Sequence, residues 1–391
     1  MDFGFSEEQE AAREAAKGAF AHVAVDTVPS PALTPGAVAD DFDRDLWDRL
    51  ARADLLGLTV PVRHGGSGLD AVALCLVLRE AGRVLARVPL VETGAAALTL
   101  AEYGSDELCA RLLPRIARGE LALTVAGQGA SGHERPELAV SARPSAERLS
   151  AERPSAERPS SAGNGDGGGW VLDGVQTAVP WGRTADLVVV PAHTADGRPL
   201  LAVLAPGATS GGVVLDEQAS TNGEPYARLR LDAVRVPAGD VIEDAAAPAH
   251  LWRLLTTGTC ALALGLGSKV LEMTSAYVSG REQFGFPVAT FQAVAVQSAD
   301  RYIDLRAMEA TLWQAAWRLD PAEVAVAKMW ASDGVRRLVQ TAQHLHGGMG
   351  TDTDYPLHRF HAWAKQWELS YGSAAAHEEA LGELLAAREP A

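Results

Sequence analysis

Cysteine is scarce in this sequence, and its scarcity excludes two kinds of structural support. Cys75, Cys109 and Cys260 are odd in number and far apart, and they form no C-x-x-C pair. Neither a disulfide framework nor a structural zinc site is therefore expected. A reducing compartment suits such a chain best, so we expect the protein to be cytoplasmic.

Long apolar runs and an N-terminal basic segment are also missing. No run approaches the roughly 18 apolar residues that a membrane span requires. The first residues, MDFGFSEEQE, carry acids where a signal peptide carries basic side chains. We expect neither export nor insertion into a membrane.

Positive charge is in deficit as well. The chain has 34 Lys and Arg against 50 Asp and Glu, which gives a formal charge of −16 at pH 7. Most of such a surface repels nucleic acid, so a nucleic-acid partner is not expected. This negative net charge does not exclude a local basic cleft that binds an anionic cofactor.

The local patterns predict an α+β fold in three parts. Residues 1–125 are typical of an N-terminal α-helical domain, in which Ser6 caps a first helix with acids in its first turn. Residues 126–245 contain short β-branched runs between Gly, Pro and Asp, as in a central antiparallel β domain. Residues 246–391 return to long apolar helices and predict a C-terminal four-helix bundle.

A low-complexity insertion, at about residues 143–169, interrupts the central part. It repeats a PSAER-like pentapeptide three times between Pro144 and Arg158 and ends in a Gly-rich tail. Its apolar content is too low to offset the entropy lost on ordering, so we expect a solvated, mobile segment. A repeat that docks a partner is the alternative.

Two glycine-containing motifs could bind a nucleotide. In the first, Arg281 offers a fork-shaped cation for a pyrophosphate, Gln283 can donate to its oxygens, and Phe284 can pack against a flat ring. Gly285 is expected to end the helix that precedes it. A solvent-facing Arg and a core Phe at a helix end would be the default for such a motif in isolation.

The second motif is the turn HLHGGMG, from His344 to Gly350. Gly347 and Gly348 leave backbone N–H groups exposed where a side chain would block a phosphate. A plain helix end is the alternative. His344 and His346 are two residues apart, but no acid or cysteine is near them, so we expect no metal site.

Four stretches occur in the same order as in one known family and extend over essentially the whole chain. They are SEEQ (6–9), LGLTVPVRHGGSGL (56–69), REQFGFPVATFQAV (281–294) and HLHGGMG (344–350). With the order of helices, strands and helices, they make the chain resemble the acyl-CoA dehydrogenase family of flavoproteins. The resemblance implies FAD as cofactor and the oxidation of an acyl thioester, carried by CoA or by an acyl carrier protein.

The resemblance also implies which residues touch the cofactor and that subunits share it. Arg281 and Phe284 match positions that contact FAD, and Gln292 matches one that reaches the flavin of a neighbouring subunit. The turn at Gly347 and Gly348 matches the one that meets the partner's pyrophosphate, with His344 where the family commonly has Gln. An oligomer follows, either a homo-oligomer (dimer or tetramer) or a hetero-oligomer with a related subunit.

The expected catalytic base is missing. Relatives place a Glu just before a Gly near the last helix, where this chain has Tyr371, or on the helix before Arg281, where residues 250–258 contain no acid. A phenol with a pKa near ~10 is ionised about one part in a thousand at pH 7, so the catalytic residue is unknown. Glu368 is the nearest acid, although a salt bridge to Lys365 is its alternative role.

The flavin-side residues of the central part differ from the family as well. Pro180 stands where relatives often have a Thr or Ser donor, and residues 124–134 replace the usual loop before it. Proline offers no side-chain or backbone donor, so that contact is lost. Trp181 could stack on the flavin or be an ordinary buried Trp of the β domain.

Three functions remain compatible with the sequence. The chain could be an FAD-dependent acyl-CoA dehydrogenase that uses Glu368 or Tyr371 as an unusual base. It could instead be a structural partner subunit whose companion supplies the carboxylate. It could also be a flavin monooxygenase on the same scaffold, which needs no such base but usually uses reduced FMN, and Arg281 favours FAD over FMN.

Overall fold

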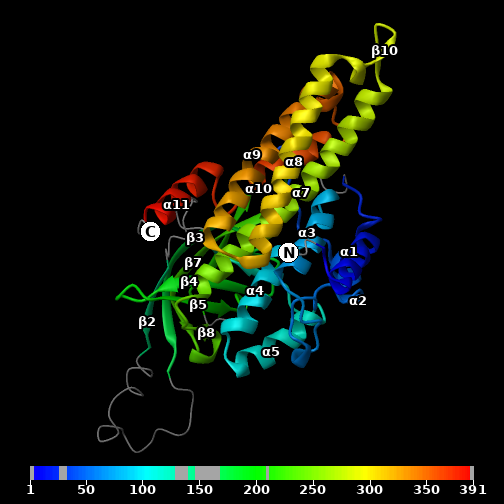
Figure 1. Cartoon of the computed structure of the whole chain (residues 1–391). Coiled ribbons are helices and arrows are strands. Elements are labelled where there is room, and N and C mark those ends of the chain that lie inside the picture. Colours follow the sequence, from blue (N-terminus) through cyan, green and yellow to red (C-terminus); the bar gives the residue numbers. More distant parts are fainter. Residues whose placement is uncertain (1–3, 26–32, 128–139, 146–167, 208–210, 388–391) are drawn as a thin grey trace, which may run out of the picture.

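The computed structural model describes residues 4–25, 33–127, 140–145, 168–207 and 211–387 (Figure 1). The longer helices are α1 (Glu7–Phe20), α2 (Arg44–Arg52), α3 (Ala71–Arg83), α4 (Leu90–Tyr103), α5 (Asp106–Ala117), α7 (Ala247–Gly280), α8 (Gln292–Arg318), α9 (Pro321–His346), α10 (Leu357–Leu369) and α11 (Ala374–Ala386). Short 3-10 turns are η1 (Val62–His64), η3 (Ala238–Asp240), η4 (Val288–Thr290) and η5 (Gly347–Thr351).

The strands are β1 (Leu123–Val125), β2 (Val140–Pro144), β3 (Trp170–Pro180), β4 (Leu187–His193), β5 (Pro199–Leu204), β6 (Val213–Ala219), β7 (Pro225–Val236), β8 (Val241–Ile242), β9 (Glu282–Gln283) and β10 (Phe286–Pro287). Helices, strands and helices thus follow one another as the sequence predicts, and the α+β class is confirmed (Figure 1). The limits of the three domains stay a prediction.

The central sheet is mixed rather than purely antiparallel. Its strand order is β6-β7-β3-β2-β4-β5-β8, and β1 pairs with β4 outside this path. Most neighbours are antiparallel, but β1 and β2 both run parallel to β4. These two strands are separated from β4 along the chain by β3, so a hairpin turn does not force them to be antiparallel to it.

The insertion connects β2 to β3, which are antiparallel neighbours in the sheet. Pro144 of β2 pairs with Trp170 of β3, and the N–H of Ser145 donates to the carbonyl of Gly169 at 2.8 Å. The two ends of the insertion are therefore adjacent, so a segment can be added here without displacing a strand. The predicted mobility of the insertion concerns residues 146–167, which lie outside the described part of the chain.

The N-terminal helices cover one side of the sheet and the base of the bundle (Figure 1). Ser6 caps α1 as predicted: its Oγ accepts from the Gln9 N–H at 3.2 Å, and Gln9 returns a bond to the Ser6 N–H at 3.0 Å. Residues 92–120 read as one helix in the sequence, but the chain breaks at Gly104, and Ser105 caps α5.

Five long helices follow the sheet. The first three, α7 to α9, pack on one another as predicted. The C-terminal stretch 366–389, expected as the fourth helix, is instead divided after Leu369 into the end of α10 and a separate α11, and both helices pack on α9. By length and composition, α7 could cross a membrane, yet 78% of its most apolar window is buried within the protein. It packs on α3, α4, α8, α9 and α10, which is how the central helix of a helical core behaves.

Two apolar cores result. One joins the N-terminal helices, the inner side of the sheet and the bundle, and the other fills the β part. All three cysteines are buried and unpaired.

Candidate functional site

Tyr371 lies in the turn between α10 and α11, at the position where a base was expected. The residue has φ +57°, and only 6% of its surface is exposed. Its ring meets Trp252 of α7 edge to face, with centroids 5.3 Å apart. Burial raises the pKa of the phenol well above 10, so Tyr371 is neutral at any physiological pH and cannot take up a proton.

Glu368 is held by cations away from this ring. Its carboxylate contacts Lys365 Nζ at 2.6 Å and Arg336 Nε at 3.9 Å. The salt bridge to Lys365 that the sequence offered as an alternative is therefore present. Glu368 does not line the interior cavity described below.

Lys328 of α9 fixes the end of α10, a role that sequence reasoning missed. Its side chain is buried, and Nζ donates to Ser332 Oγ at 2.7 Å, to the Trp367 carbonyl at 2.9 Å and to the Glu368 carbonyl at 3.0 Å. Three donors thus meet three acceptors, two of which are carbonyls that a helix end leaves unpaired. Burial lowers the pKa of Lys328 to about 8. A single Lys inside the apolar run EVAVAKMWA was the available signal.

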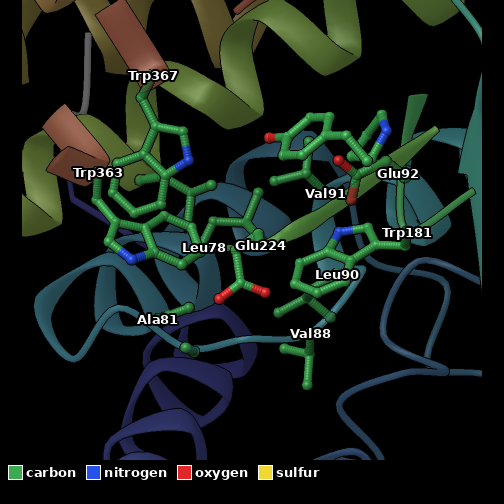
Figure 2. A pocket seen from close by; sticks show the side chains of 14 residues that line it. Leu78, Ala81, Val88, Leu90, Val91, Glu92, Trp181, Glu224, Trp363 and Trp367 are labelled. Carbon is green, nitrogen blue, oxygen red and sulfur yellow. The ribbon is translucent and has the colours of Figure 1, made fainter. Parts of the chain in front are cut away.

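A small cavity lies among the N-terminal helices, the sheet and the bundle (Figure 2). Its volume is about 40 Å³, room for one or two water molecules. Three indoles are among the side chains that line it, those of Trp181, Trp363 and Trp367. Neither an isoalloxazine ring nor an acyl chain fits in such a volume.

Trp181 follows the irregular end of β3. The register of β3 against β7 shifts between Gln176 and Val179, and both Ala178 and Trp181 have positive φ. This bend turns the Trp181 ring inward, where it is 6% exposed and meets Phe42 edge to face at 6.2 Å. Trp181 is thus buried at the end of β3, and its stacking on a flavin stays a prediction. The loop expected before it falls mostly in residues 128–139, outside the described residues.

Two carboxyl groups line the cavity. Glu224 pairs with Arg87, whose Nε and Nη2 lie 2.5 and 3.2 Å from its oxygens. Glu92 of α4 has no basic side chain among its described contacts and is 8% exposed. Burial raises the pKa of Glu92 to about 7, against a smaller opposing effect of its own backbone N–H. Sequence reasoning missed Glu92, although a single Glu inside the apolar stretch LVETGAAALTLA was an available signal.

The predicted nucleotide residues lie elsewhere, at the far end of the bundle. Figure 1 shows the β9–β10 hairpin projecting from the ends of α7 and α8, away from the sheet. All seven residues named for the cofactor are exposed there: Arg281, Gln283, Phe284, Gln292, His344, Gly347 and Gly348. None of them lines the cavity.

One prediction about this hairpin is wrong. Gly285 does not end the long helix, because α7 stops at Gly280 and Arg281 is its C-cap. Phe284 and Gly285 instead form the two-residue turn of the hairpin, with φ +53° and +81°. Two successive positive φ values are what a tight hairpin turn of this type requires. The turn leaves Phe284 90% exposed.

The end of α9 lies beside the end of α7. His346, the last residue of α9, stacks on Tyr277 of α7 with ring centroids 4.4 Å apart. Tyr277 is one helical turn before Arg281, and Gly347 directly follows His346. The two predicted nucleotide segments, 281–284 and 344–348, are thus brought together, and we call them the clamp. A Cβ added at Gly347 or Gly348 would meet nothing within 4 Å, so both sides of the turn are open.

The two ends of α7 are far apart. Trp252, which touches Tyr371, precedes Arg281 by 29 residues in the same helix. At 1.5 Å per residue the separation is about 44 Å. Within the described residues, no group of three or more His, Cys, Asp or Glu could hold a metal ion.

Comparison with known proteins identifies relatives over the whole chain. Residues 6–120 match the sequence profile of the acyl-CoA dehydrogenase N-terminal domain, and residues 256–385 match that of the acyl-CoA dehydrogenase C-terminal domain. The chain is 34% identical to the acyl-CoA dehydrogenase FadE27 of Mycobacterium tuberculosis, over 93% of this chain and 95% of that protein.

Two solved structures are similar in both sequence and fold. A chain of the ChsE4-ChsE5 complex from Mycobacterium tuberculosis is 33% identical, with a TM-score of 0.85 and full coverage of both chains. A chain of a variant of the Tcur3481-Tcur3483 steroid ACAD is 34% identical, with a TM-score of 0.82 and 97% coverage of each chain. Both are described as assemblies of two named components.

Proposed function

Because the chain belongs to the acyl-CoA dehydrogenase family, we propose that it is one subunit of an FAD-dependent acyl-CoA dehydrogenase built from two different, related chains. In this proposal the partner subunit supplies the base, and this chain supplies the clamp that holds the nucleotide part of FAD. The observation that carries the proposal is the contrast between the two ends of α7. At one end stands the buried phenol of Tyr371, and at the other the clamp is exposed.

The clamp suits a dinucleotide. Within the described part of the chain, the Arg281 guanidinium has no acidic partner, so its charge is available to a pyrophosphate. Phe284 offers an exposed flat ring, and the open turn at Gly347 and Gly348 lets a phosphate approach the backbone. FAD, when bound, would accept the hydride that leaves Cβ of the substrate.

The chain's own interior does not suit the flavin ring. Pro180 offers no donor, the neighbouring indole of Trp181 is turned inward, and about 40 Å³ remains open. With the clamp about 44 Å along α7 from Tyr371, a nucleotide held at the clamp would have its flavin against another subunit. We therefore assign no step of the reaction to this chain's cavity.

The surface beside the clamp suits a partner subunit. Large apolar side chains are exposed on the hairpin and along α8, where soluble monomers rarely gather them. They are Phe284, Phe286, Phe291, Val296, Tyr302 and Ile303. Val296 and Ile303 are seven residues apart and share one helix face. The FadE27 and ChsE4-ChsE5 relationships favour a related dehydrogenase chain as the occupant.

The substrate we propose is a thioester of a bulky acid, since one relative is described as a steroid ACAD. Its carrier is CoA or an acyl carrier protein. We place the assembly in the cytoplasm, which suits three unpaired buried thiols.

Co-expression with a related dehydrogenase chain that carries the usual Glu tests the proposal. Alone, this chain should retain little FAD and bleach no flavin with a panel of acyl-CoA thioesters under anaerobic conditions. The purified mixed oligomer should hold FAD and be reduced by at least one thioester. Arg281→Ala in this chain should weaken FAD binding by the mixed oligomer about tenfold or more, as expected for a lost charge-assisted contact.

Arg318→Ala provides the matched control, because Arg318 is an exposed arginine at the other end of α8 that pairs with Glu323. A soluble homo-oligomer of this chain with full activity would contradict the proposal. Extraction of FMN without FAD would favour the flavin monooxygenase instead, since that enzyme also needs no carboxylate at residue 371.

A further inference from the structure

His346 joins the two halves of the clamp. It is the last residue of α9 and is 2% exposed. One face of its imidazole stacks on Tyr277, with an angle of 21° between the ring planes. Tyr355, which lies between η5 and α10, approaches the same imidazole, with ring centroids 5.2 Å apart. Three segments of the chain therefore meet at this one ring.

The hydrogen bonds of His346 fix its tautomer and its orientation. Nδ1 lies 2.7 Å from the Ala342 carbonyl, and a carbonyl only accepts, so Nδ1 carries the proton. Nε2 lies 3.1 Å from the Tyr355 hydroxyl and accepts from it in the neutral ring. Burial lowers the pKa of His346, which keeps the ring neutral. Both ring nitrogens are thus hydrogen-bonded, and these two bonds fix the orientation of the ring plane.

The stacked rings of His346 and Tyr277 lie directly beside both segments of the clamp. Tyr277 precedes Arg281 by one turn, and the Arg281 N–H donates to the Tyr277 carbonyl at 2.9 Å. On the other side, Gly347 follows His346 directly and has φ +58°. The stack therefore links the turn of α7 that precedes Arg281 to the residue that precedes the glycine turn.

We propose that His346 is a positioning residue that sets the spacing between Arg281 and the Gly347–Gly348 turn. Its stacked face holds the end of α7, and its two ring nitrogens hold the end of α9 and Tyr355. In this proposal His346 acts through the residues on either side of it. The inference rests on the proposed function only in naming FAD as what the clamp holds.

Hydrogen–deuterium exchange of the purified chain tests the coupling without relying on the cofactor or on a partner subunit. His346→Ala removes both the stack and the hydrogen bonds, so amides in peptides covering 274–281 and 342–352 should both exchange about tenfold faster. His346→Phe restores only a flat ring, so residues 274–281 should recover their protection while 342–352 stay fast. Gln340→Ala, an exposed position on the same helix, should leave both regions unchanged.

The possible results distinguish the proposed coupling from a local role of His346 at the end of α9. Faster exchange confined to residues 342–352 in His346→Ala would overturn the coupling, as would a His346→Phe variant that gives 274–281 no protection. Should His346→Ala fail to fold, the His346→Phe comparison decides alone. In a second arm, FAD fluorescence titration of the apo mixed oligomer should show about tenfold weaker binding with His346→Ala. Changed exchange with unchanged FAD affinity would leave the coupling standing and remove the assignment of FAD to the clamp.

Discussion

Replacing Glu92 by Gln should stabilise the protein at alkaline pH and make its stability less dependent on pH. Glu92 is buried beside the cavity, and no basic side chain among the described residues offsets its charge. Its pKa is about 7 in the folded chain, against 4.5 for the ordinary side chain. The folded protein therefore binds the Glu92 proton more tightly than the unfolded chain does.

The direction of the effect follows from that difference. Below about pH 4.5 the carboxyl is protonated in both states, and its contribution to stability is fully present. As the pH rises to about 7, the unfolded chain releases the proton first, so the free energy of unfolding falls. At 1.36 kcal/mol per pKa unit, the loss is about 3 kcal/mol, and it is complete above pH 7. A Gln of similar shape cannot ionise and avoids this loss.

Scanning calorimetry between pH 5 and pH 8.5 measures the effect and also reports whether unfolding is a single transition. With an unfolding entropy near 2.1 cal/mol/K per residue, about 3 kcal/mol corresponds to roughly 4 °C for a chain of this length. We expect Glu92→Gln to melt up to about 4 °C above the parent at pH 8 and near it at pH 5. Glu378→Gln, at an exposed position, is the control. A parallel pH dependence of parent and Glu92→Gln would refute the reasoning.

Two further changes test the turn at residue 371. Tyr371→Glu should not produce acyl-CoA oxidation by this chain alone, because residue 371 does not line the cavity and the cavity's volume of about 40 Å³ is too small for an acyl chain; anaerobic flavin bleaching by any thioester would contradict this. Lys328→Met removes the three hydrogen bonds that Nζ donates and leaves the Trp367 carbonyl without that donor, while the Glu368 carbonyl still accepts from Ser332 Oγ at 3.0 Å, so the free energy of unfolding should fall by roughly 1–3 kcal/mol. Calorimetry checks this against Lys365→Met, whose side chain is 46% exposed, and equal melting temperatures for the two variants would contradict it.

Local patterns in the sequence were enough to predict most elements. The β-branched runs from Trp170 to Val236 form strands within a few residues of their predicted limits, because alternation and turn residues act locally. The Ser6 cap of α1 was also predictable, because its hydrogen-bond partner Gln9 is only three residues away. The break at Gly104 was missed, since the helical pattern continues on both sides of it. Parallel pairing of β1 with β4 was also missed, because it joins strands more than 60 residues apart.

The buried polar residues could not be predicted in this way. Glu92, Lys328 and His346 each acquire a role from segments distant in sequence: the cavity, the end of α10 and Tyr277. The burial of the Trp181 ring depended equally on the bend at the end of β3.

The length of α7 separates the region around Tyr371 from the clamp. Trp252 and Tyr371 contact each other near one end, and Arg281 and Tyr277 are at the other, about 44 Å away. Substitutions that far apart and without shared contacts are usually independent in their effect on stability. In the proposed assembly, a phenol at residue 371 therefore imposes no strain on the clamp. This chain could then leave proton transfer to its partner and still hold the nucleotide.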